Sequence, residues 1–323
     1  MAVLVTGGAG FVGSHLVDRL LEHSKNVVVF DNLSTGRLAN LARAMSTGRV
    51  TFVYADVAQP AAEIERLWNE ASGERCMHIY HLASPASPEA YASLPWQTLS
   101  VNALGTMSLV ELALAHRAKM LFASTSEVYG DPLEHPQPES YFGNVNPVGP
   151  RSMYDEGKRF GEAVMATAVA HRRLDGRVAR IFNCYGPRMA RDDGRLIPAL
   201  FTAARSRQPL PIHGDGRQTR SLTYVQDLID GLILLASTPT LGFEPVNLGS
   251  EEERSVAEIA RMVARIAGVP FEVQILPGRP EDPQRRKPRI DRARSLGWDP
   301  STPLELGLRE TYGWFGHEAL LQA

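Results

Sequence analysis

The sequence predicts an α/β protein with a Rossmann-type doubly wound parallel sheet and a smaller, mixed C-terminal substrate domain. Three observations indicate this fold class. A strand at residues 2–6 runs through a glycine-rich turn into a helix, strands and helices then alternate, and a late helix and strand between residues 225 and 248 resume the alternation. Alternating strands and helices form parallel sheets with right-handed crossovers. We therefore expect residues 1–182 and 223–249 in the first domain, and residues 183–222 and 250–323 in the second.

The hydrophobic pattern places the individual elements. Short apolar runs predict strands at residues 2–6, 27–30, 50–54, 79–83, 120–124 and 246–248. Helical spacing of apolar residues predicts helices at residues 11–22, 102–118, 154–171, 225–236 and 255–267. Ligands bind at the carboxyl edge of doubly wound sheets. That edge would carry Gly7, Asp31, Ala83 and Thr125.

The composition is typical of a soluble globular protein. The 323 residues are 44% apolar and carry a formal net charge of −2, which argues against a nucleic-acid-binding surface. The two cysteines, Cys76 and Cys184, belong to no Cys-x-x-Cys or Cys/His cluster, so neither a disulfide framework nor a metal site is expected. No apolar run approaches the length of a membrane span, and a strand beginning at Ala2 leaves no room for a signal peptide. We expect a cytoplasmic protein without a membrane or nucleic-acid partner.

The glycine-rich turn predicts a dinucleotide site. Gly7, Gly10 and Gly13 allow a tight turn, close approach of the backbone to a pyrophosphate and close helix packing, while the helix N-terminus faces the phosphates. Asp31 ends the next strand, where an acidic residue holds the adenosine ribose hydroxyls. A carboxylate there would repel a 2′-phosphate, so NAD is favoured over NADP, although Arg37 could bind such a phosphate.

Other cofactor contacts are expected along the same edge. Asp56 and Val57 either receive the adenine or form a polar turn. The remaining predicted cofactor residues are Phe11, Val12, Asn32, Thr35, Gly36, Leu82, Ala83, Ser84, Tyr154, Lys158 and Arg188.

Tyr154 and Lys158 form the central catalytic motif. Four residues apart on a helix, they share one face, and a nearby ammonium would favour the phenolate, so that Tyr154 could take a proton from an alcohol near neutral pH. An ordinary surface helix would show the same spacing. Thr125 and Ser126 would lie opposite this helix, where a hydroxyl can hydrogen-bond the same substrate oxygen; the alternative is a capped turn.

Together these motifs resemble the extended short-chain dehydrogenase/reductase family, whose members modify nucleotide sugars. Long strings resemble UDP-glucuronic acid decarboxylases in particular: HLASPASP (81–88), STSEVYGDP (124–132), NVNP (144–147), YDEGKR (154–159), RIFN (180–183) and YGPRM (185–189). The chain as a whole is also similar to UDP-glucuronic acid 4-epimerases of the type found in moenomycin biosynthesis.

The resemblance implies a UDP-sugar substrate and a set of residues around it. The implied substrate-binding residues are Pro85, Thr125, Ser126, Asn183, Arg195, Gln218, Arg220 and Arg286. It also implies that Glu127 acts with Arg286 in decarboxylase chemistry. A homodimer is expected from pairing of the helices at residues 102–118 and 154–171, whose Leu109, Leu112, Val164 and Val169 need not all fit beneath one sheet.

We expect oxidation of the sugar at carbon 4, with NAD taking the hydride, to give a 4-keto intermediate. Whether this intermediate is epimerised or decarboxylated depends on Arg191. A guanidinium that grips both carboxylate oxygens opposes loss of carbon dioxide, because it restrains rotation and stabilises the charge that decarboxylation would disperse. Arg191 lies in a loop that resembles the one by which uronic-acid 4-epimerases supply an arginine to the sugar carboxylate, so the resemblance makes it the candidate for this grip. This favours 4-epimerisation of UDP-glucuronic acid to UDP-galacturonic acid. Decarboxylation to UDP-xylose is the alternative, and a non-catalytic NAD-binding regulator is a remote one.

Overall fold

A computed structural model describes residues 2–23, 25–239, 243–278 and 284–321. Its centre is a seven-stranded sheet with the strand order β11-β6-β5-β4-β1-β2-β3. The strands are β1 (Ala2–Thr6), β2 (Asn26–Asp31), β3 (Val50–Tyr54), β4 (Cys76–His81), β5 (Lys119–Thr125), β6 (Asp175–Ile181) and β11 (Val246–Leu248). All neighbouring strands run parallel. The order reverses between β1 and β4, which is the switch point where such sheets bind ligands. The predicted fold class is confirmed.

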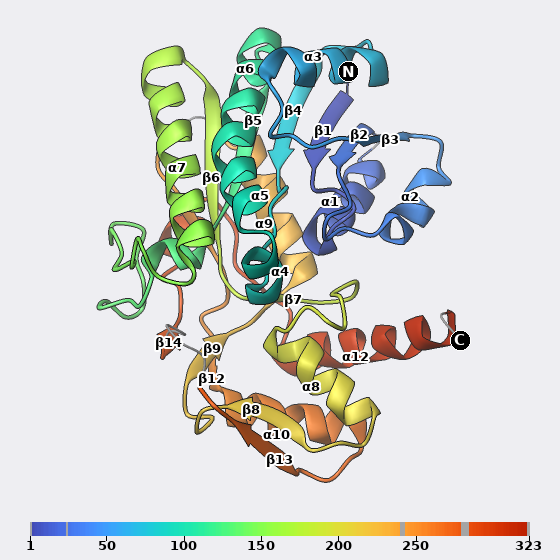
Figure 1. Cartoon of the computed structure of the whole chain (residues 1–323), viewed down its shortest axis with the longest axis vertical. Helices are drawn as coiled ribbons and strands as arrows, with labels where there is room; N and C mark the ends of the chain where they lie inside the picture. The colour runs from blue at the N-terminus through green and yellow to red at the C-terminus, as the bar shows by residue number, and fades with distance from the viewer. Residues whose placement is uncertain (1, 24, 240–242, 279–283, 322–323) are drawn as a thin grey trace.

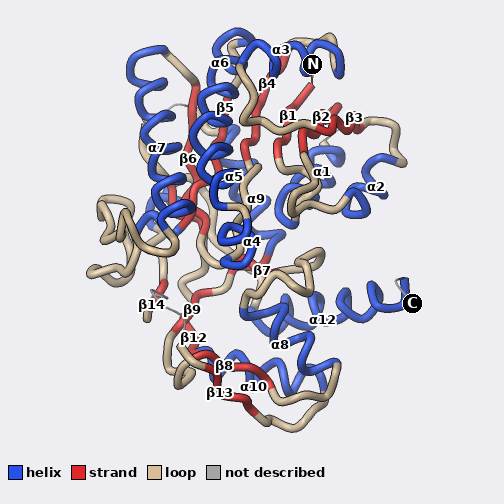
Figure 2. The backbone as a smooth tube through the Cα atoms, in the orientation of Figure 1, coloured by secondary structure: helices blue, strands red, loops and turns tan. Residues whose placement is uncertain are grey.

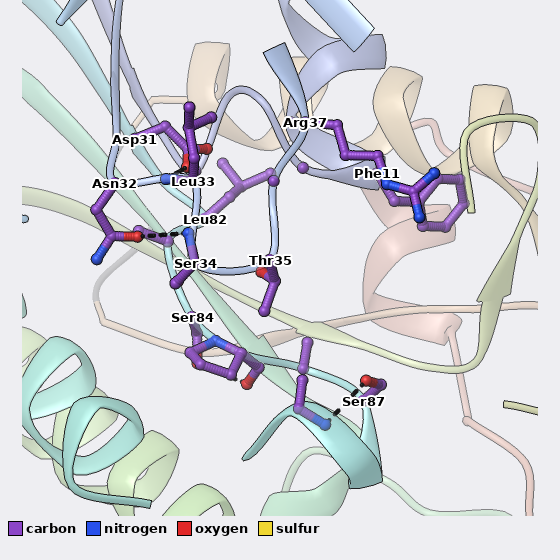
Figure 3. Close-up of a pocket in the computed structure, with 18 of the residues that line it drawn as sticks. Phe11, Asp31, Asn32, Leu33, Ser34, Thr35, Arg37, Leu82, Ser84 and Ser87 are labelled. Carbon is purple, nitrogen blue, oxygen red and sulfur yellow. Dashed lines mark hydrogen bonds between the residues drawn. The ribbon is translucent and has the colours of Figure 1, made fainter. Parts of the chain in front are cut away.

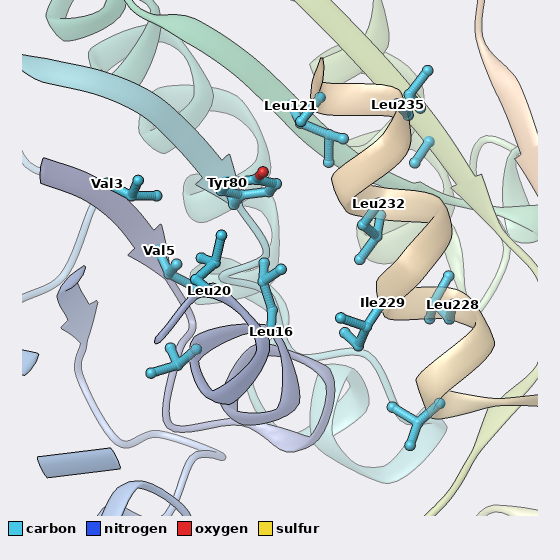
Figure 4. Close-up of a cluster of buried hydrophobic side chains, with 14 of the residues drawn as sticks. Val3, Val5, Leu16, Leu20, Tyr80, Leu121, Leu228, Ile229, Leu232 and Leu235 are labelled. Atoms are coloured by element: carbon cyan, nitrogen blue, oxygen red, sulfur yellow. The ribbon is translucent and has the colours of Figure 1, made fainter. Parts of the chain in front are cut away.

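Strand alternation divides the core into two layers. Val3 and Val5 of β1 face the helices α1 (Phe11–Glu22) and α9 (Val225–Ser237), whereas Leu4 faces the opposite layer. Figure 4 shows side chains of α1 and α9 meeting those of the sheet in the first layer. Because successive strand side chains point to opposite faces, one apolar strand serves both layers. Both faces of the sheet are thereby covered (Figure 1).

The opposite layer contains α3 (Ala61–Ala71), α7 (Ser152–Arg172) and a continuous helical stretch. This stretch comprises α5 (Pro95–Ser100), the π-helical η2 (Val101–Gly105) and α6 (Thr106–His116). It is long and apolar enough to cross a membrane, which the sequence analysis missed, but 56% of its apolar window is buried inside the protein. Its burial beside α3 and α7 accounts for its apolar character as a core helix.

The apolar residues invoked for a dimer are accommodated within this layer. Leu109 and Leu112 are fully buried, and Val164 and Val169 pack against the same core. That argument for a dimer is therefore wrong, because these side chains do fit beneath the sheet.

The smaller unit lies below the sheet and has its own core (Figures 1 and 2). It contains α8 (Leu196–Arg205), α10 (Val256–Ala267), α12 (Leu304–Leu321) and the parallel pair β8 (Leu210–His213) and β13 (Val273–Leu276). A second small sheet joins β9 (Thr219–Ser221) to β12 (Glu253–Ser255) and β14 (Arg285–Arg286). Ser255 and Glu258 form a capping box that starts α10.

The remaining elements are short. They are η1 (Leu38–Leu41), α2 (Ala42–Met45), α4 (Pro88–Ser93), η3 (Ser126–Tyr129), β7 (Cys184–Tyr185), β10 (Thr223–Tyr224) and α11 (Asp291–Ser295). The predicted domain ranges put α11 in the smaller domain, but Ala293 of α11 and the flanking Ile290 and Trp298 pack into the core of the sheet domain. Trp298 also donates its indole N–H to the carbonyl of Asp227 in α9, 2.8 Å away. A continuous range of residues 250–323 in the second domain therefore does not describe the packing.

Candidate active site

The glycine-rich turn lies at one side of a cavity of about 700 Å³. Gly7 has a φ of 73°, and a Cβ there would lie 2.7 Å from the backbone nitrogen of Ala83. A Cβ on Gly13 would lie 2.1 Å from the carbonyl oxygen of Gly7, so the helix packs directly on the turn. The N-cap residue of α1 is Gly10, which has no side chain to cap the helix. The open N-terminus of α1 and its glycine backbone fit a pyrophosphate.

Asp31 lies at the end of the cavity that the adenosine ribose would occupy (Figure 3). Its carboxylate accepts hydrogen bonds from the backbone N–H groups of Ala9, at 2.9 Å, and Leu33, at 2.8 Å. Burial raises the pKa of Asp31, and these two hydrogen bonds act in the opposite direction. The carboxylate is thus oriented by the backbone and retains lone pairs for ribose hydroxyls. Arg37, also at this cavity, lies 3.4 Å from Asp192.

Most other predicted cofactor residues line the same cavity. They are Phe11, Val12, Asn32, Thr35, Gly36, Asp56, Val57, Leu82, Ala83, Ser84 and Arg188. Arg188 pairs with Asp18 at 2.6 Å, and its Nη1 is buried with no hydrogen-bond partner among the described residues. An unsatisfied guanidinium nitrogen beside the glycine turn fits an anionic ligand.

A second cavity of about 510 Å³ lies between the sheet edge and the smaller unit. Both cavities share Val12, Leu82, Ser84, Ala86, Glu89 and Arg195 as lining residues, so they adjoin at the carboxyl end of β4. Tyr154, Lys158 and Thr125 line the second cavity from the sheet side. Gln218 and Val256 line it from the smaller unit. A ligand in the first cavity can therefore meet one held in the second.

Tyr154 lies in α7, next to the end of β5. Burial raises its pKa to about 12, while a hydrogen bond with Thr125 opposes the shift. Lys158 Nζ donates to the carbonyl of Ala123 at 2.8 Å and lies 5.9 Å from the centre of the Tyr154 ring. Burial lowers the pKa of Lys158 to about 7. Burial disfavours the charged form of both groups, and the predicted effect of Lys158 on the pKa of Tyr154 stays a prediction.

Glu127 is the centre of a buried ion-pair cluster. Its oxygens lie 2.5 and 3.1 Å from the Nη1 and Nη2 atoms of Arg286, and Arg151 Nη2 lies 2.5 Å from the second oxygen. Burial alone would raise the pKa of Glu127, but Arg286 and Arg151 together hold it below its ordinary value. Glu127 is therefore ionised at neutral pH and is the counter-ion of two arginines.

The other predicted substrate residues divide into two groups. Ser126, Asn183, Arg195, Gln218 and Arg220 line the second cavity. Pro85 lines the first cavity and, of the described residues, is not among those that line the second.

Arg191 differs from its predicted position. Its guanidinium donates to the carbonyl of Phe315 in α12 at 2.8 Å, and within the described chain it is not among the residues lining either cavity. The prediction that Arg191 grips a sugar carboxylate is therefore corrected, because the loop after Pro187 turns this side chain toward α12.

Tyr91 and Arg151 are among the residues of the cavity wall that sequence reasoning missed. Tyr91 stacks on Tyr154 with ring centres 5.0 Å apart and an angle of 11° between the planes. The Arg151 guanidinium lies 5.8 Å from the centre of the Tyr91 ring. Arg151 precedes Tyr154 by three residues, so helical spacing could have indicated its position; nothing local identifies Tyr91.

No metal site is found among the described residues, which contain no suitable group of three or more His, Cys, Asp or Glu side chains. His81 illustrates the structural role of a buried histidine. It lies between Thr6 and Thr106 at 2.8 and 3.2 Å, and burial lowers its pKa to about 3. The cysteines Cys76 and Cys184 are free thiols.

The doubly wound sheet, the glycine turn and the adjoining Tyr–Lys cavity define a dinucleotide-dependent enzyme of the extended short-chain dehydrogenase/reductase class. The chain belongs to the NAD dependent epimerase/dehydratase family, whose model matches residues 3–249. It uses NAD and acts on nucleotide sugars, as the sequence predicted.

Individual relatives and structures agree with this family. UDP-glucuronic acid decarboxylase 1 of Xenopus tropicalis is 44% identical over 322 residues, which cover 99% of this chain and 73% of the relative. UDP-glucuronic acid decarboxylase 3 of Arabidopsis thaliana is 44% identical over 311 residues, 95% of this chain and 87% of the relative. The structure of UDP-glucose 4-epimerase from Thermotoga maritima with UDP-glucose is 28% identical, with a TM-score of 0.89 and coverage of 99% and 100%. The dTDP-glucose 4,6-dehydratase of Streptomyces venezuelae, with NAD bound, also reaches a TM-score of 0.89 at 26% identity, with coverage of 99% and 98%.

Proposed function

We propose that the protein is a UDP-glucuronic acid decarboxylase that releases carbon dioxide and forms UDP-xylose. The observation that carries this proposal is the bidentate pairing of Arg286 with Glu127 at the wall of the second cavity. The relatives with 44% identity over most of the chain, which are decarboxylases by name, support the same reaction.

The first half of the reaction uses the sheet side of the cavity. Tyr154 removes the proton from the hydroxyl at carbon 4 of the glucuronic acid, and Thr125 or Ser126 holds that oxygen. NAD held along the first cavity, beside the glycine turn and Asp31, would supply the hydride acceptor for carbon 4 and would supply the hydride again once carbon dioxide has left. Lys158, whose Nζ donates to the carbonyl of Ala123, would hold the ribose of the nicotinamide nucleoside. Burial raises the pKa of Tyr154 to about 12, and its hydrogen bond with Thr125, which favours proton removal, opposes this shift.

The second half depends on how the substrate carboxylate is held. A 4-keto sugar carries its carboxylate β to the ketone, so the C5–C6 electron pair can pass into an enolate as carbon dioxide leaves. Carbon 5 then takes up a proton, and net redox change is zero. Arg286 and Arg151 are paired with Glu127, and Arg195 is paired with Asp193. Guanidinium groups already neutralised by protein carboxylates stabilise a substrate carboxylate less, which favours its loss.

This proposal replaces the preference for 4-epimerisation, which rested on Arg191. With its guanidinium on the carbonyl of Phe315, Arg191 offers no support for a grip on the sugar. Epimerisation to UDP-galacturonic acid and a non-catalytic regulator remain as outcomes of the test.

The test is incubation of the protein with UDP-glucuronic acid and identification of products by NMR, with carbon dioxide measured in parallel. We expect UDP-xylose and one equivalent of carbon dioxide. UDP-galacturonic acid without carbon dioxide would establish epimerisation instead, and unchanged substrate would favour the regulator. Arg191→Ala is the control variant for the epimerase hypothesis, and it should leave the ratio of UDP-xylose to UDP-galacturonic acid unchanged.

We also propose a homodimer built on the helical layer beside α7. Four large apolar side chains of α5, η2, α6 and α7 are exposed: Trp96, Leu104, Met107 and Phe160. Exposed apolar patches favour association of subunits. A monomeric mass by light scattering at micromolar concentration would exclude this dimer, and Leu104→Glu should convert a dimer to monomers. The cytoplasmic location stays a prediction.

A further inference from the structure

Arg286 reaches the second cavity from a strand of only two residues. This strand, β14, pairs with β9 through Arg286 and Arg220, and it lies between the sheet and the smaller unit (Figure 1). Directly after it, the backbone N–H of Lys287 donates to Gln137 Oε1 at 2.9 Å. The carbonyl of Lys287 accepts from the backbone N–H of Gln137, also at 2.9 Å. One residue, 150 positions earlier, thus holds both backbone groups of the residue that follows Arg286.

Gln137 is itself rigidly held. Its side chain is fully buried, and its Nε2 donates to the carbonyl of Glu134 at 2.8 Å. Because the amide nitrogen faces a carbonyl, Oε1 must face the Lys287 N–H. The carbonyl of Gln137 accepts from the N–H of Arg289 at 2.9 Å and from Asn247 Nδ2 at 3.0 Å. The contacts on both sides fix the backbone from residue 287 to residue 289.

A chain of buried and partly buried hydrogen bonds joins the contacts of Gln137 to the sheet. Tyr129 donates its hydroxyl to Asn247 Oδ1 at 2.8 Å, and Arg180 Nη1 donates to the Tyr129 oxygen at 2.9 Å. Arg180 also binds Glu162 through Nε and Nη2, at 2.9 and 2.7 Å, and Ser124 donates to Glu162 at 2.5 Å. Ser124 immediately precedes Thr125 at the end of β5. These hydrogen bonds therefore fix the position of the segment that carries Arg286 relative to β5, the strand that ends in Thr125.

We propose that Gln137 is a positioning residue that sets Arg286 against Glu127, and this inference rests on the proposed decarboxylation. Arg286 Nη1 lies 2.5 Å from one oxygen of Glu127, so a small shift of residues 286–288 would break the bidentate pair. Arg286, once released, would be available to grip the substrate carboxylate. Release of carbon dioxide would then slow, whereas oxidation at carbon 4, which uses Tyr154 and Thr125, would continue.

The experiment compares Gln137→Met, which has nearly the same length but no amide, with wild type and Tyr141→Phe. Tyr141 lies on the same loop, and its hydroxyl accepts a hydrogen bond from the backbone N–H of Leu133 at 3.1 Å. For each protein, single-turnover absorbance of reduced nicotinamide reports oxidation at carbon 4, and carbon dioxide release reports decarboxylation. We expect Gln137→Met to slow carbon dioxide release by on the order of tenfold to a hundredfold, with reduced nicotinamide accumulating and KM changing less than kcat. Tyr141→Phe should match wild type.

A second comparison tests the route through Arg286. In an Arg286→Met background, Gln137→Met should have no further effect on carbon dioxide release, because the residue that it positions is gone. Tyr129→Phe, which removes the next link without removing the ring, should shift the same ratio in the same direction if Gln137→Met fails to fold. Equal loss of oxidation and decarboxylation, or a full additional effect in the Arg286→Met background, would overturn the inference. Absence of carbon dioxide from wild type would instead refute the proposed function.

Discussion

The ring of Tyr91 stacks on the ring of Tyr154, with centres 5.0 Å apart and planes within 11° of parallel. Tyr91 belongs to α4, which follows the loop at the carboxyl end of β4, whereas Tyr154 belongs to α7. The stack therefore joins the segment beside the first cavity to the proposed base. Tyr91 is 3% exposed, and its hydroxyl is buried with no hydrogen-bond partner among the described residues.

Replacement of Tyr91 should separate the role of the ring from that of the hydroxyl. Tyr91→Leu removes the stack, and since such pairs contribute about 0.5–1.5 kcal/mol, we expect kcat to fall about twofold to tenfold. Tyr91→Phe keeps the ring and removes a buried, unsatisfied hydroxyl, so it should retain kcat and raise Tm. Steady-state kinetics and thermal melting check both variants. Equal activity of the leucine and phenylalanine variants would mean that the stack does not position Tyr154.

Tyr154→Phe should abolish turnover and leave NAD bound, because it removes the proposed base and none of the contacts at the glycine turn. Loss of one well-placed acid or base costs on the order of a hundredfold to ten-thousandfold. Product formation and the NAD content of the purified protein are the two measurements. Activity within a few-fold of wild type would remove Tyr154 from the mechanism.

Gly13→Ala should eliminate NAD binding. The added Cβ would lie 2.1 Å from the carbonyl oxygen of Gly7, and a backbone atom in a tight turn cannot move aside without distorting the site. The matched control is Gly313→Ala in α12, where among the described residues no atom beyond the chain neighbours and the backbone of the helix itself lies within 4 Å of the new Cβ. The control should bind NAD normally and be slightly more stable, because alanine favours helix. Fluorescence titration with NAD compares them, and undiminished binding by Gly13→Ala would contradict the assigned pyrophosphate site.

Asp155→Asn should remove a pH dependence of stability. Burial raises the pKa of Asp155 to about 7, Glu127 adds to the shift, and Arg151 and Arg286 oppose it. Because its folded-state pKa lies above the unfolded value, Asp155 stabilises the fold at low pH, and this contribution is lost as the pH rises through about 7. The variant should therefore melt at a higher temperature than wild type above about pH 7. The difference should shrink toward about pH 4, where both side chains are neutral.

Thermal melting across this pH range is the measurement. Asp155 Oδ1 is buried with no hydrogen-bond partner among the described residues, which is the geometric basis for the expected gain. A difference in Tm that does not vary with pH would show that the carboxyl group keeps its ordinary pKa.

Local patterns in the sequence were sufficient for six of the seven strands of the sheet, all but β6, and for part of the site. A strand, three glycines and a helix form one continuous segment, so Gly7, Gly10 and Gly13 could be interpreted without any distant contact. The helical spacing of Tyr154 and Lys158 likewise follows from four residues of sequence. Parallel strands share a carboxyl edge, which is why Asp31 and Thr125 could be assigned to it from their places at strand ends.

Contacts between distant segments were decided by the tertiary structure alone. Arg286 and Glu127 are 159 positions apart, and their pairing depends on β14 being held beside β9 and Gln137. The direction of Arg191 depends on where α12 passes, which no local pattern specifies. The pKa values of Tyr154 and Lys158 depend on burial, a property of all the segments packed around them. Sequence periodicity indicates which residues share a face of a helix or strand. Ion pairing and desolvation depend instead on neighbours in three dimensions. The ion pair of Glu127 and the direction of Arg191 determined our choice of decarboxylation over epimerisation.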